Sequence, residues 1–181
     1  MNIAIYGGSF DPFHLAHEKI IDICLNKLDI ENLFIVPTFL NPFKDSSFLD
    51  ASTRLDLINE LYKDNKNINI IDYEVKQNKK VSSYQTVNYL LENYDISKIY
   101  LIIGADNLKD IHLWYNFKNL KELVQFVVIN RDGIHLKNDY INPIYIDLQQ
   151  NISSTALRKN MELKHIPTKI QNKVKKLWKI E

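Results

Sequence analysis

Short runs of apolar residues alternate along this chain with longer stretches in which apolar residues recur every three or four positions. The runs predict β-strands over residues 1–6, 33–36, 68–71, 99–103, 126–129 and 144–148. Because these runs are apolar at consecutive positions, they are typical of strands that a sheet buries on both faces. Glycine or proline follows several of the runs, which predicts a turn where the strand ends.

The stretches between the runs have the spacing of amphipathic helices. The first helix is predicted to begin near residue 14, and others follow Asp50, a candidate N-cap, and begin near residues 83, 153 and 168. Thr168 and Gln171 resemble a capping box for the last of them. The apolar stripe of the first helix consists of Ala16, Ile20, Ile23 or Cys24, and Leu28.

Strands that alternate with helices predict an α/β fold, a Rossmann-like doubly wound parallel sheet covered on both faces. The length of 181 residues suits a single domain, residues 1–181, with a small C-terminal helical segment. In such a sheet, ligands bind outside the carboxyl ends of the strands, near the point where the strand order reverses. The glycines that follow the first and fourth predicted strands lie at such ends.

Composition and charge exclude several classes of protein. A hydrophobic content of 45% and a charged content of 25% are ordinary for a globular protein. Lys+Arg number 23 and Asp+Glu 22, a net charge of +1, and this balance argues against a nucleic-acid surface. No stretch approaches the roughly 20 apolar residues that span a bilayer, so no membrane partner is expected.

The cellular compartment is predicted from the single cysteine and the start of the chain. One cysteine, Cys24, excludes a disulfide within the chain and fits a reducing compartment. The chain opens directly on a predicted strand, without the pattern of a secretory leader. We therefore expect a cytoplasmic protein, and the oligomeric state stays open, a homo-oligomer included.

The junction between the first strand and the first helix predicts a phosphate site. Gly7 and Gly8 end the strand, and His14 and His17, three positions apart, share one face of the helix start. The unpaired N–H groups of a helix N-terminus attract phosphate, and two imidazoles add donors there. The alternatives are a plain turn with capping histidines, or a metal site. The zinc pattern of metalloproteases needs histidines at i and i+4 with a glutamate between them, which this chain lacks.

Arg54 stands in the first turn of the predicted helix after Asp50. A cation is unfavourable there because the helix dipole is positive at that end. This position suggests that an anion is the partner of Arg54.

The run GGSFDPFHLAH, residues 7–17, resembles the signature of the nucleotidyltransferase superfamily. Within the superfamily it is most similar to the bacterial nicotinate-nucleotide adenylyltransferases, which read GGxFDPxHxGH. The chain departs from this pattern only at Ala16, where the family has glycine. Four later segments extend the resemblance: NPFK at 41–44, SYQT at 83–86, GAD at 104–106 followed by Trp114-Tyr115, and ISSTALR at 152–158. Phe43 replaces the usual histidine, and Leu157 the usual isoleucine or valine.

The resemblance implies a role for each matching position. The residues expected to compensate charge during catalysis are His14, His17, Lys44 and Arg158. The residues expected to bind ATP are Gly7, Gly8, Ser9, Phe10, Gly104, Asp106, Ile152, Ser153, Ser154 and Thr155. Those expected to bind the pyridine nucleotide are Thr86, Asp106, Trp114 and Tyr115.

The resemblance also implies the reaction: transfer of the adenylyl group of ATP to nicotinate mononucleotide, with Mg²⁺ accompanying ATP and no protein metal site. Phosphopantetheine and nicotinamide mononucleotide are the alternative acceptors within the superfamily. A nucleotide-binding module without activity would tolerate loss of some of the histidines, Lys44 and Arg158, all of which are present. A hydride-transferring enzyme is disfavoured because no G-x-G-x-x-G follows the first strand.

Overall fold

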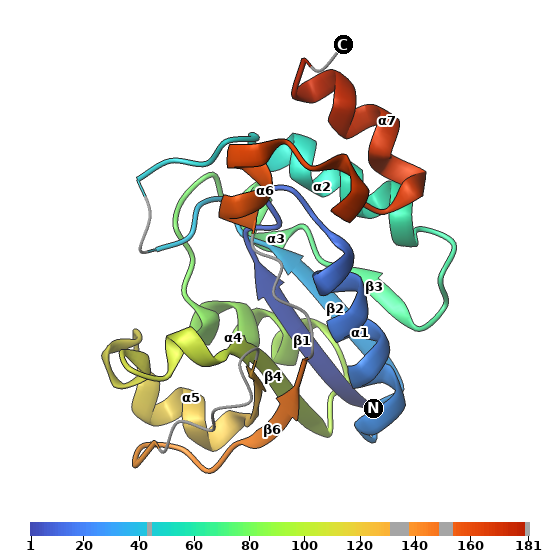
Figure 1. The fold of residues 1–181 in the computed structure, drawn as a ribbon. Coiled ribbons are helices and arrows are strands. Elements are labelled where there is room, and N and C mark those ends of the chain that lie inside the picture. The colour runs from blue at the N-terminus through green and yellow to red at the C-terminus, as the bar shows by residue number, and fades with distance from the viewer. Residues whose placement is uncertain (43–44, 131–137, 149–153, 180–181) are drawn as a thin grey trace.

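The computed structural model describes residues 1–42, 45–130, 138–148 and 154–179 (Figure 1). Six strands form one sheet in the order β3-β2-β1-β4-β5-β6, and every neighbouring pair is parallel. All the predicted strands are present, which confirms the α/β doubly wound class. Their bounds are β1 Asn2–Gly8, β2 Asn32–Pro37, β3 Ile68–Ile70, β4 Lys98–Gly104, β5 Gln125–Asn130 and β6 Ile144–Asp147.

Helices cover both faces of the sheet (Figure 1). Alternate side chains of each strand point to opposite faces, so Ala4 and Tyr6 of β1 pack in one core while Ile3 and Ile5 pack in the other. The first core is closed by α1, α2, α6 and α7, and the second by α4 and α5. The helix bounds are α1 Leu15–Lys27, α2 Ala51–Tyr62, α3 Tyr73–Lys76, α4 Ser83–Asn93, α5 Phe117–Leu123, α6 Ser154–Asn160 and α7 Thr168–Leu177, with short 3₁₀ turns η1 Ala105–Asn107, η2 Ile111–Leu113 and η3 Leu163–His165.

The strand order places the carboxyl ends of β1 and β4 side by side. The chain moves from β1 outward to β2 and β3, then crosses back so that β4 pairs with the other edge of β1. The crevice of an open α/β sheet forms at this reversal. Gly8 and Gly104 end these two strands, as the sequence predicts.

The structure differs from the sequence prediction at several helices. Neither α3 nor α5 was predicted, because segments of four and seven residues are too short to show a helical repeat. The predicted capping box of the last helix is wrong. Pro167 precedes that helix, Thr168 is its first residue, and Gln171 instead donates its side-chain amide to the carbonyl of Leu163. Asp50 is confirmed as an N-cap, since its carboxylate accepts the N–H of Thr53 at 2.8 Å.

The C-terminal segment, α6 to α7, packs over α2 at the end of the sheet (Figure 1). Lys173 of α7 pairs with Glu60 of α2, and Lys169 donates to the carbonyl of Leu61.

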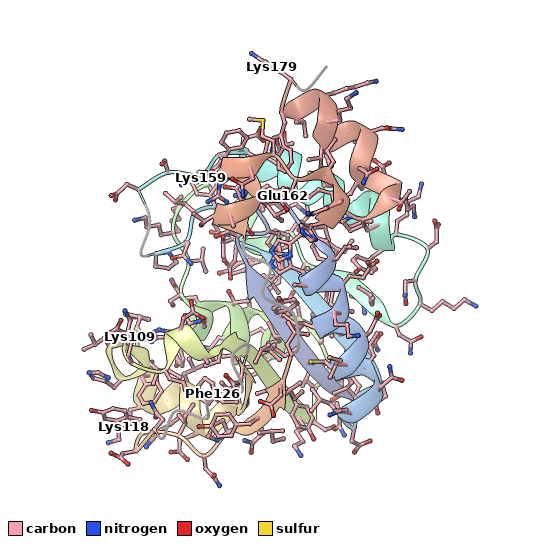
Figure 2. The ribbon with its side chains drawn as sticks, viewed as in Figure 1. Lys109, Lys118, Phe126, Lys159, Glu162 and Lys179 are labelled. Carbon is pink, nitrogen blue, oxygen red and sulfur yellow. The ribbon has the colours of Figure 1, made fainter. Side chains whose placement is uncertain are left out.

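The lysines labelled in Figure 2 are exposed and lie at opposite ends of the molecule, with Lys109 and Lys118 near α5 and Lys179 beyond α7. Over the described part of the chain, no helix has the length and apolar character needed to cross a membrane.

Candidate active site

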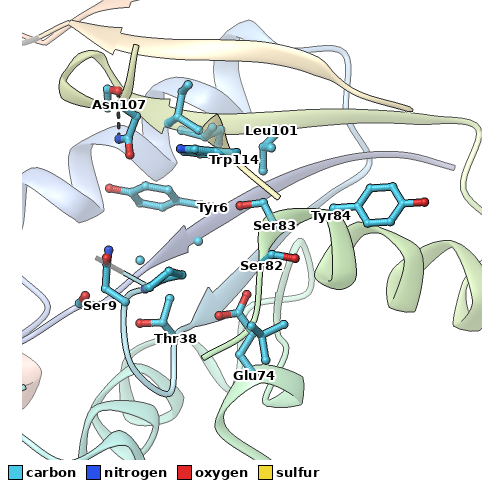
Figure 3. A pocket seen from close by; sticks show the side chains of 18 of the residues that line it. Tyr6, Ser9, Thr38, Glu74, Ser82, Ser83, Tyr84, Leu101, Asn107 and Trp114 are labelled. Carbon is cyan, nitrogen blue, oxygen red and sulfur yellow. Dashed lines mark hydrogen bonds between the residues drawn. The ribbon is translucent and has the colours of Figure 1, made fainter. Parts of the chain in front are cut away.

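A cavity of about 520 Å³ lies at the carboxyl ends of β1 and β4 (Figure 3). Its volume falls within the range of small-molecule sites, roughly 300–1,000 Å³. Segments far apart in the chain form its walls: the end of β1 and the loop after it, α1, the loop after β2, the turn before α4, the end of β4, and α6. Of the predicted site residues, the lining includes Gly7, Gly8, Ser9, Phe10, His17, Gly104, Asp106, Trp114, Tyr115 and Ser154.

The loop after β1 turns sharply because of Gly8 and Phe10. Phe10 has a φ of 46°, in the left-handed region, and its ring is buried beneath the cavity. A Cβ on Gly8 would lie 3.1 Å from that ring. Glycine at position 8 therefore lets the phenyl ring fold back under the loop, which holds the backbone of Ser9 at the cavity.

His14 and His17 stack on each other, with ring centroids 3.6 Å apart. The backbone N–H of His14 donates to Nδ1 of His17 at 3.2 Å. Because Nδ1 accepts this bond, the proton of the neutral His17 ring lies on Nε2, where it can be donated to a ligand. His17 lines the cavity, whereas His14 is buried and does not. The structure thus brings His17 to the cavity and stacks His14 against it, and a role of both imidazoles at the ligand stays a prediction.

Asp11 joins the first motif to the last one. Its buried carboxylate accepts the backbone N–H groups of Phe48 and Leu49, at 2.8 and 2.9 Å. Arg158 of α6 donates from Nη1 to the carbonyl of Asp11 and lies 3.8 Å from its carboxylate. The late arginine therefore meets the N-terminal loop directly, as a shared triphosphate site requires.

Arg54 has no need of an anion, contrary to the sequence prediction. Its guanidinium is buried and donates to three backbone carbonyls: Nη1 to Ser9, Nη2 to Phe39, and Nε to Leu49. Burial lowers the pKa of Arg54, and the nearby carboxylates of Asp11 and Asp50 oppose that shift. Arg54 therefore holds the loop after β1 and both ends of the loop after β2 in register.

The end of β4 carries the GAD motif. A Cβ on Gly104 would lie 2.3 Å from Oδ1 of Asp106, so only glycine leaves room for this position of the carboxylate. Asn107 donates to the carbonyl of Gly104 at 3.1 Å and closes the turn. Trp114 and Tyr115 form the next part of the wall, and the Tyr115 side chain is 66% exposed. An exposed aromatic wall beside a polar turn is suited to a flat ring with polar substituents.

Thr86 lies behind the cavity wall and is not part of it. Its hydroxyl is buried and donates to Oε1 of Glu74 at 2.6 Å. Ser82, Ser83 and Tyr84, one turn earlier, line the cavity instead. In the structure Thr86 holds Glu74, and its direct contact with the pyridine nucleotide stays a prediction.

Some predicted positions are distant from the cavity or outside the described residues. Thr155 is exposed, does not line the cavity, and accepts a bond from Arg158 at 3.3 Å. Lys44, Ile152 and Ser153 lie outside the described residues, as does Phe43. The described residues Asn41, Pro42 and Ser154 line the cavity.

Comparisons with known proteins agree with this arrangement. Residues 5–160 match the family model of cytidylyltransferase-like proteins. The chain is 42% identical over 179 residues to a "Probable nicotinate-nucleotide adenylyltransferase" from Sulfurimonas denitrificans, which covers 99% of this chain and 96% of the relative. It is 41% identical over 180 residues to a protein of the same name from Aliarcobacter butzleri, in an alignment that covers 99% of this chain and 98% of the relative. This chain belongs to the nicotinate-nucleotide adenylyltransferase family.

Solved structures share the fold of this family member. The nicotinic acid mononucleotide adenylyltransferase of Plasmodium falciparum, complexed with NaAD, superposes with a TM-score of 0.81. Its sequence identity is 21%, and the alignment covers 99% of this chain and 96% of the other. The same protein complexed with APC superposes with a TM-score of 0.79. At this identity the likeness establishes the doubly wound fold.

The nicotinate-nucleotide adenylyltransferase signature is altered in this chain at Ala16 alone, and the structure shows where the extra methyl goes. Ala16 is completely buried in the core that α1 forms with the sheet. It does not line the cavity. The substitution therefore changes packing beneath the loop, and the walls of the cavity are made by other residues.

Sequence reasoning did not identify Glu74, Asp11 or Arg54 as residues of the nicotinate-nucleotide adenylyltransferase site. Asp11 stood inside the recognised motif, and its hydrogen bonds reach residues more than 35 positions away. Arg54 carries a signal, an unfavourable charge at a helix start, which predicts an anionic partner, whereas its partners in the structure are three carbonyls. Glu74 carries a weaker sequence signal, because it is a carboxylate between a predicted strand and a predicted helix.

Proposed function

We propose that this protein transfers the adenylyl group of ATP to nicotinate mononucleotide, forming nicotinate adenine dinucleotide and pyrophosphate. One observation carries the proposal: the first and last motifs meet at one cavity. His17 of α1 and Ser154 of α6 line that cavity, and Arg158 is bonded to Asp11 of the first motif. The names of the relatives from Sulfurimonas denitrificans and Aliarcobacter butzleri support the same activity.

The chemistry requires alignment and charge compensation. An oxygen of the mononucleotide phosphate attacks the α-phosphorus of ATP, and the bond to the β-phosphate breaks as pyrophosphate leaves with its electron pair. The attacking phosphate is already ionised at pH 7, so no general base is needed. Negative charge accumulates on the leaving group, and preorganised donors stabilise it. His17 lines the cavity and could donate to that charge. Arg158 is bonded to Asp11 and lies outside the lining, so with Lys44 it is a further candidate.

The two nucleotides would occupy different parts of the cavity. Gly7, Gly8 and Ser9 after β1 and Ser154 of α6 suit the triphosphate, because these lining residues have small side chains and none is acidic. Trp114 and Tyr115 suit the pyridine ring, with the backbone of the neighbouring turn available to its substituent. Asp106, between these parts, would bond a ribose hydroxyl.

Magnesium would enter with ATP. Among the His, Cys, Asp and Glu side chains of the described ranges, no three are grouped closely enough to hold a metal ion. Mg²⁺ binds phosphate oxygens readily and keeps several waters. The ligands of the ion would therefore come from the substrate and from water.

The location of the protein in the cytoplasm stays a prediction.

The function is tested by pyrophosphate release from ATP. Nicotinate mononucleotide, nicotinamide mononucleotide and phosphopantetheine are offered separately at matched concentrations. Turnover with nicotinate mononucleotide at the highest kcat/KM supports the proposal. Preference for phosphopantetheine, or release that needs no acceptor, would contradict it.

Replacing Trp114 by alanine is expected to raise the KM for the pyridine nucleotide more than the KM for ATP. The indole would stack on the pyridine ring, and loss of a stacked aromatic pair costs about 0.5–1.5 kcal/mol, roughly three- to tenfold in KM. Steady-state kinetics with each substrate varied in turn gives both constants. Tyr140→Ala is the matched control, since that exposed aromatic lies outside the cavity lining. Equal changes in the two constants would make Trp114 a packing residue.

A further inference from the structure

Glu74 is a buried carboxyl group at the edge of the cavity that the reaction does not use. It lies in α3, is 5% exposed, and contributes to the cavity lining. Oε1 accepts the hydroxyl of Thr86 at 2.6 Å, and Oε2 has no hydrogen-bond partner among the described residues. Figure 3 shows the carboxyl group pointing toward Ser82 and the interior of the cavity, on the wall opposite Trp114.

A second polar atom on the same wall is also without a partner. The hydroxyl of Thr38 is buried and makes no hydrogen bond within the described residues. Thr38 lies beside Glu74 in the lining (Figure 3). Buried polar atoms are normally hydrogen-bonded, so the unsatisfied hydroxyl of Thr38 beside the carboxyl group of Glu74 indicates a place for a polar ligand group.

The charge of that ligand group follows from the state of Glu74. Burial raises the pKa of Glu74 to about 7, while the bond from Thr86 acts in the opposite direction. With Oε1 occupied as an acceptor, the proton of the neutral acid lies on Oε2 and can be donated into the cavity. The neutral acid can therefore donate a hydrogen bond to an anion, whereas the ionised form repels an anion.

Several charged or aromatic groups on the elements around α3 have partners of their own. Within α3, Lys76 pairs with Asp72 at 2.9 Å, and Tyr73 stacks on Tyr89 of α4. Arg54 of α2 is bonded to three carbonyls. The remaining charged groups on these helices are Asp56, Glu60 and Glu92, and β2 has no charged residue. The other titratable residues that line the cavity with Glu74 are Tyr6, His17, Tyr84, Asp106 and Tyr115.

We propose that Glu74 acts as a protonated acid that binds an anionic group of the acceptor nucleotide, so that the affinity for the acceptor falls when Glu74 ionises. The inference rests on the proposed function, because it assumes that the acceptor is an anionic mononucleotide. Thr86 holds the acid in place and leaves its other oxygen for the ligand. The anionic group is either the pyridine carboxylate or the 5′-phosphate of the acceptor.

The test compares wild type with Glu74→Gln between about pH 7 and pH 9, a range in which the substrate phosphate is already fully ionised. For wild type, the KM for nicotinate mononucleotide should rise about tenfold or more across this range, because binding is linked to one proton. Glutamine keeps the bond from Thr86 and the donor but cannot ionise, so its KM should stay nearly constant. The kcat of both proteins should be similar, and the exposed Glu92→Gln should behave as wild type.

Three outcomes are distinguishable. A wild-type protein that releases no pyrophosphate with any mononucleotide refutes the proposed function. An active wild type whose KM profile coincides with that of Glu74→Gln overturns the role of Glu74 alone. If Glu74→Gln does not fold, calorimetry on wild type at about pH 8 replaces it: binding should take up close to one proton per acceptor, and no uptake overturns the role.

A last comparison identifies the anionic group. Nicotinamide mononucleotide has the 5′-phosphate but lacks the pyridine carboxylate. If its KM rises with pH as steeply as that of nicotinate mononucleotide, the phosphate is the partner of Glu74. If the rise occurs only with the nicotinate compound, the partner is the carboxylate, and Glu74 then contributes to the choice between the two substrates.

Discussion

Replacement of His17 by alanine is expected to lower kcat about a hundredfold or more while leaving the fold intact. His17 is the imidazole that reaches the cavity, and its orientation is set by the bond from the His14 N–H to Nδ1. A donor held in place before the reaction stabilises charge on the leaving pyrophosphate without reorganisation. Loss of one such donor typically costs about 2.7–4 kcal/mol of transition-state stabilisation.

The measurement is the rate of pyrophosphate release at saturating substrates, with circular dichroism and a thermal melt as checks on folding. His112→Ala is the control, because that exposed histidine stacks on Tyr140 and lies outside the cavity lining. Near-normal turnover of a folded His17→Ala protein would remove His17 from the catalytic machinery. His14→Ala should show a smaller loss, since alanine keeps the backbone N–H that orients His17 and removes only the stacked ring.

Replacement of Arg54 by alanine is expected to lower the free energy of unfolding by about 3 kcal/mol or more. The buried carbonyl of Leu49 and the partly buried carbonyls of Ser9 and Phe39 would lose their donor. A buried acceptor left without a partner costs about 1–3 kcal/mol. In a protein of this size each kcal/mol shifts the melting temperature by about 2–4 °C, so a decrease of about 6–12 °C is expected.

Differential scanning calorimetry gives the melting temperature. Lys27→Ala, at the exposed end of α1, is the control for loss of a positive charge. Arg54→Lys should lie between wild type and alanine, since an ammonium group cannot bond three carbonyls in the fork geometry of guanidinium. A change below about 2 °C for Arg54→Ala would show that water satisfies the three carbonyls and that Arg54 does not hold the loops.

The strands and the meeting of the motifs were predictable because their causes are local. A run such as 99–103 is apolar at consecutive positions, and only burial on both faces of a sheet accommodates it. Parallel strands direct their carboxyl ends to one edge, so Gly8 and Gly104 had to lie on the same side. The resemblance of the first motif to a known family then indicated which ligand that edge binds.

The partners of buried charges were not predictable because they come from distant segments. Arg54 bonds a carbonyl 45 positions earlier in the chain, and such a partner leaves no trace in the pattern around Arg54. The same holds for Thr86 and Glu74, which are 12 positions apart and on different helices. The sequence places Thr86 near the start of a predicted helix, but the direction of its hydroxyl depends on what packs against that helix.

The amino-acid sequence alone specifies the strands, most of the helices, the edge of the sheet that binds ligand and the family of the protein. Local hydrophobic pattern and a contiguous motif are enough for these properties. Which of two stacked histidines faces the cavity, and whether a carboxyl group is neutral, depend on burial and hydrogen bonding in the folded chain. Desolvation raises the pKa of Glu74, and this requires neighbours that folding brings together.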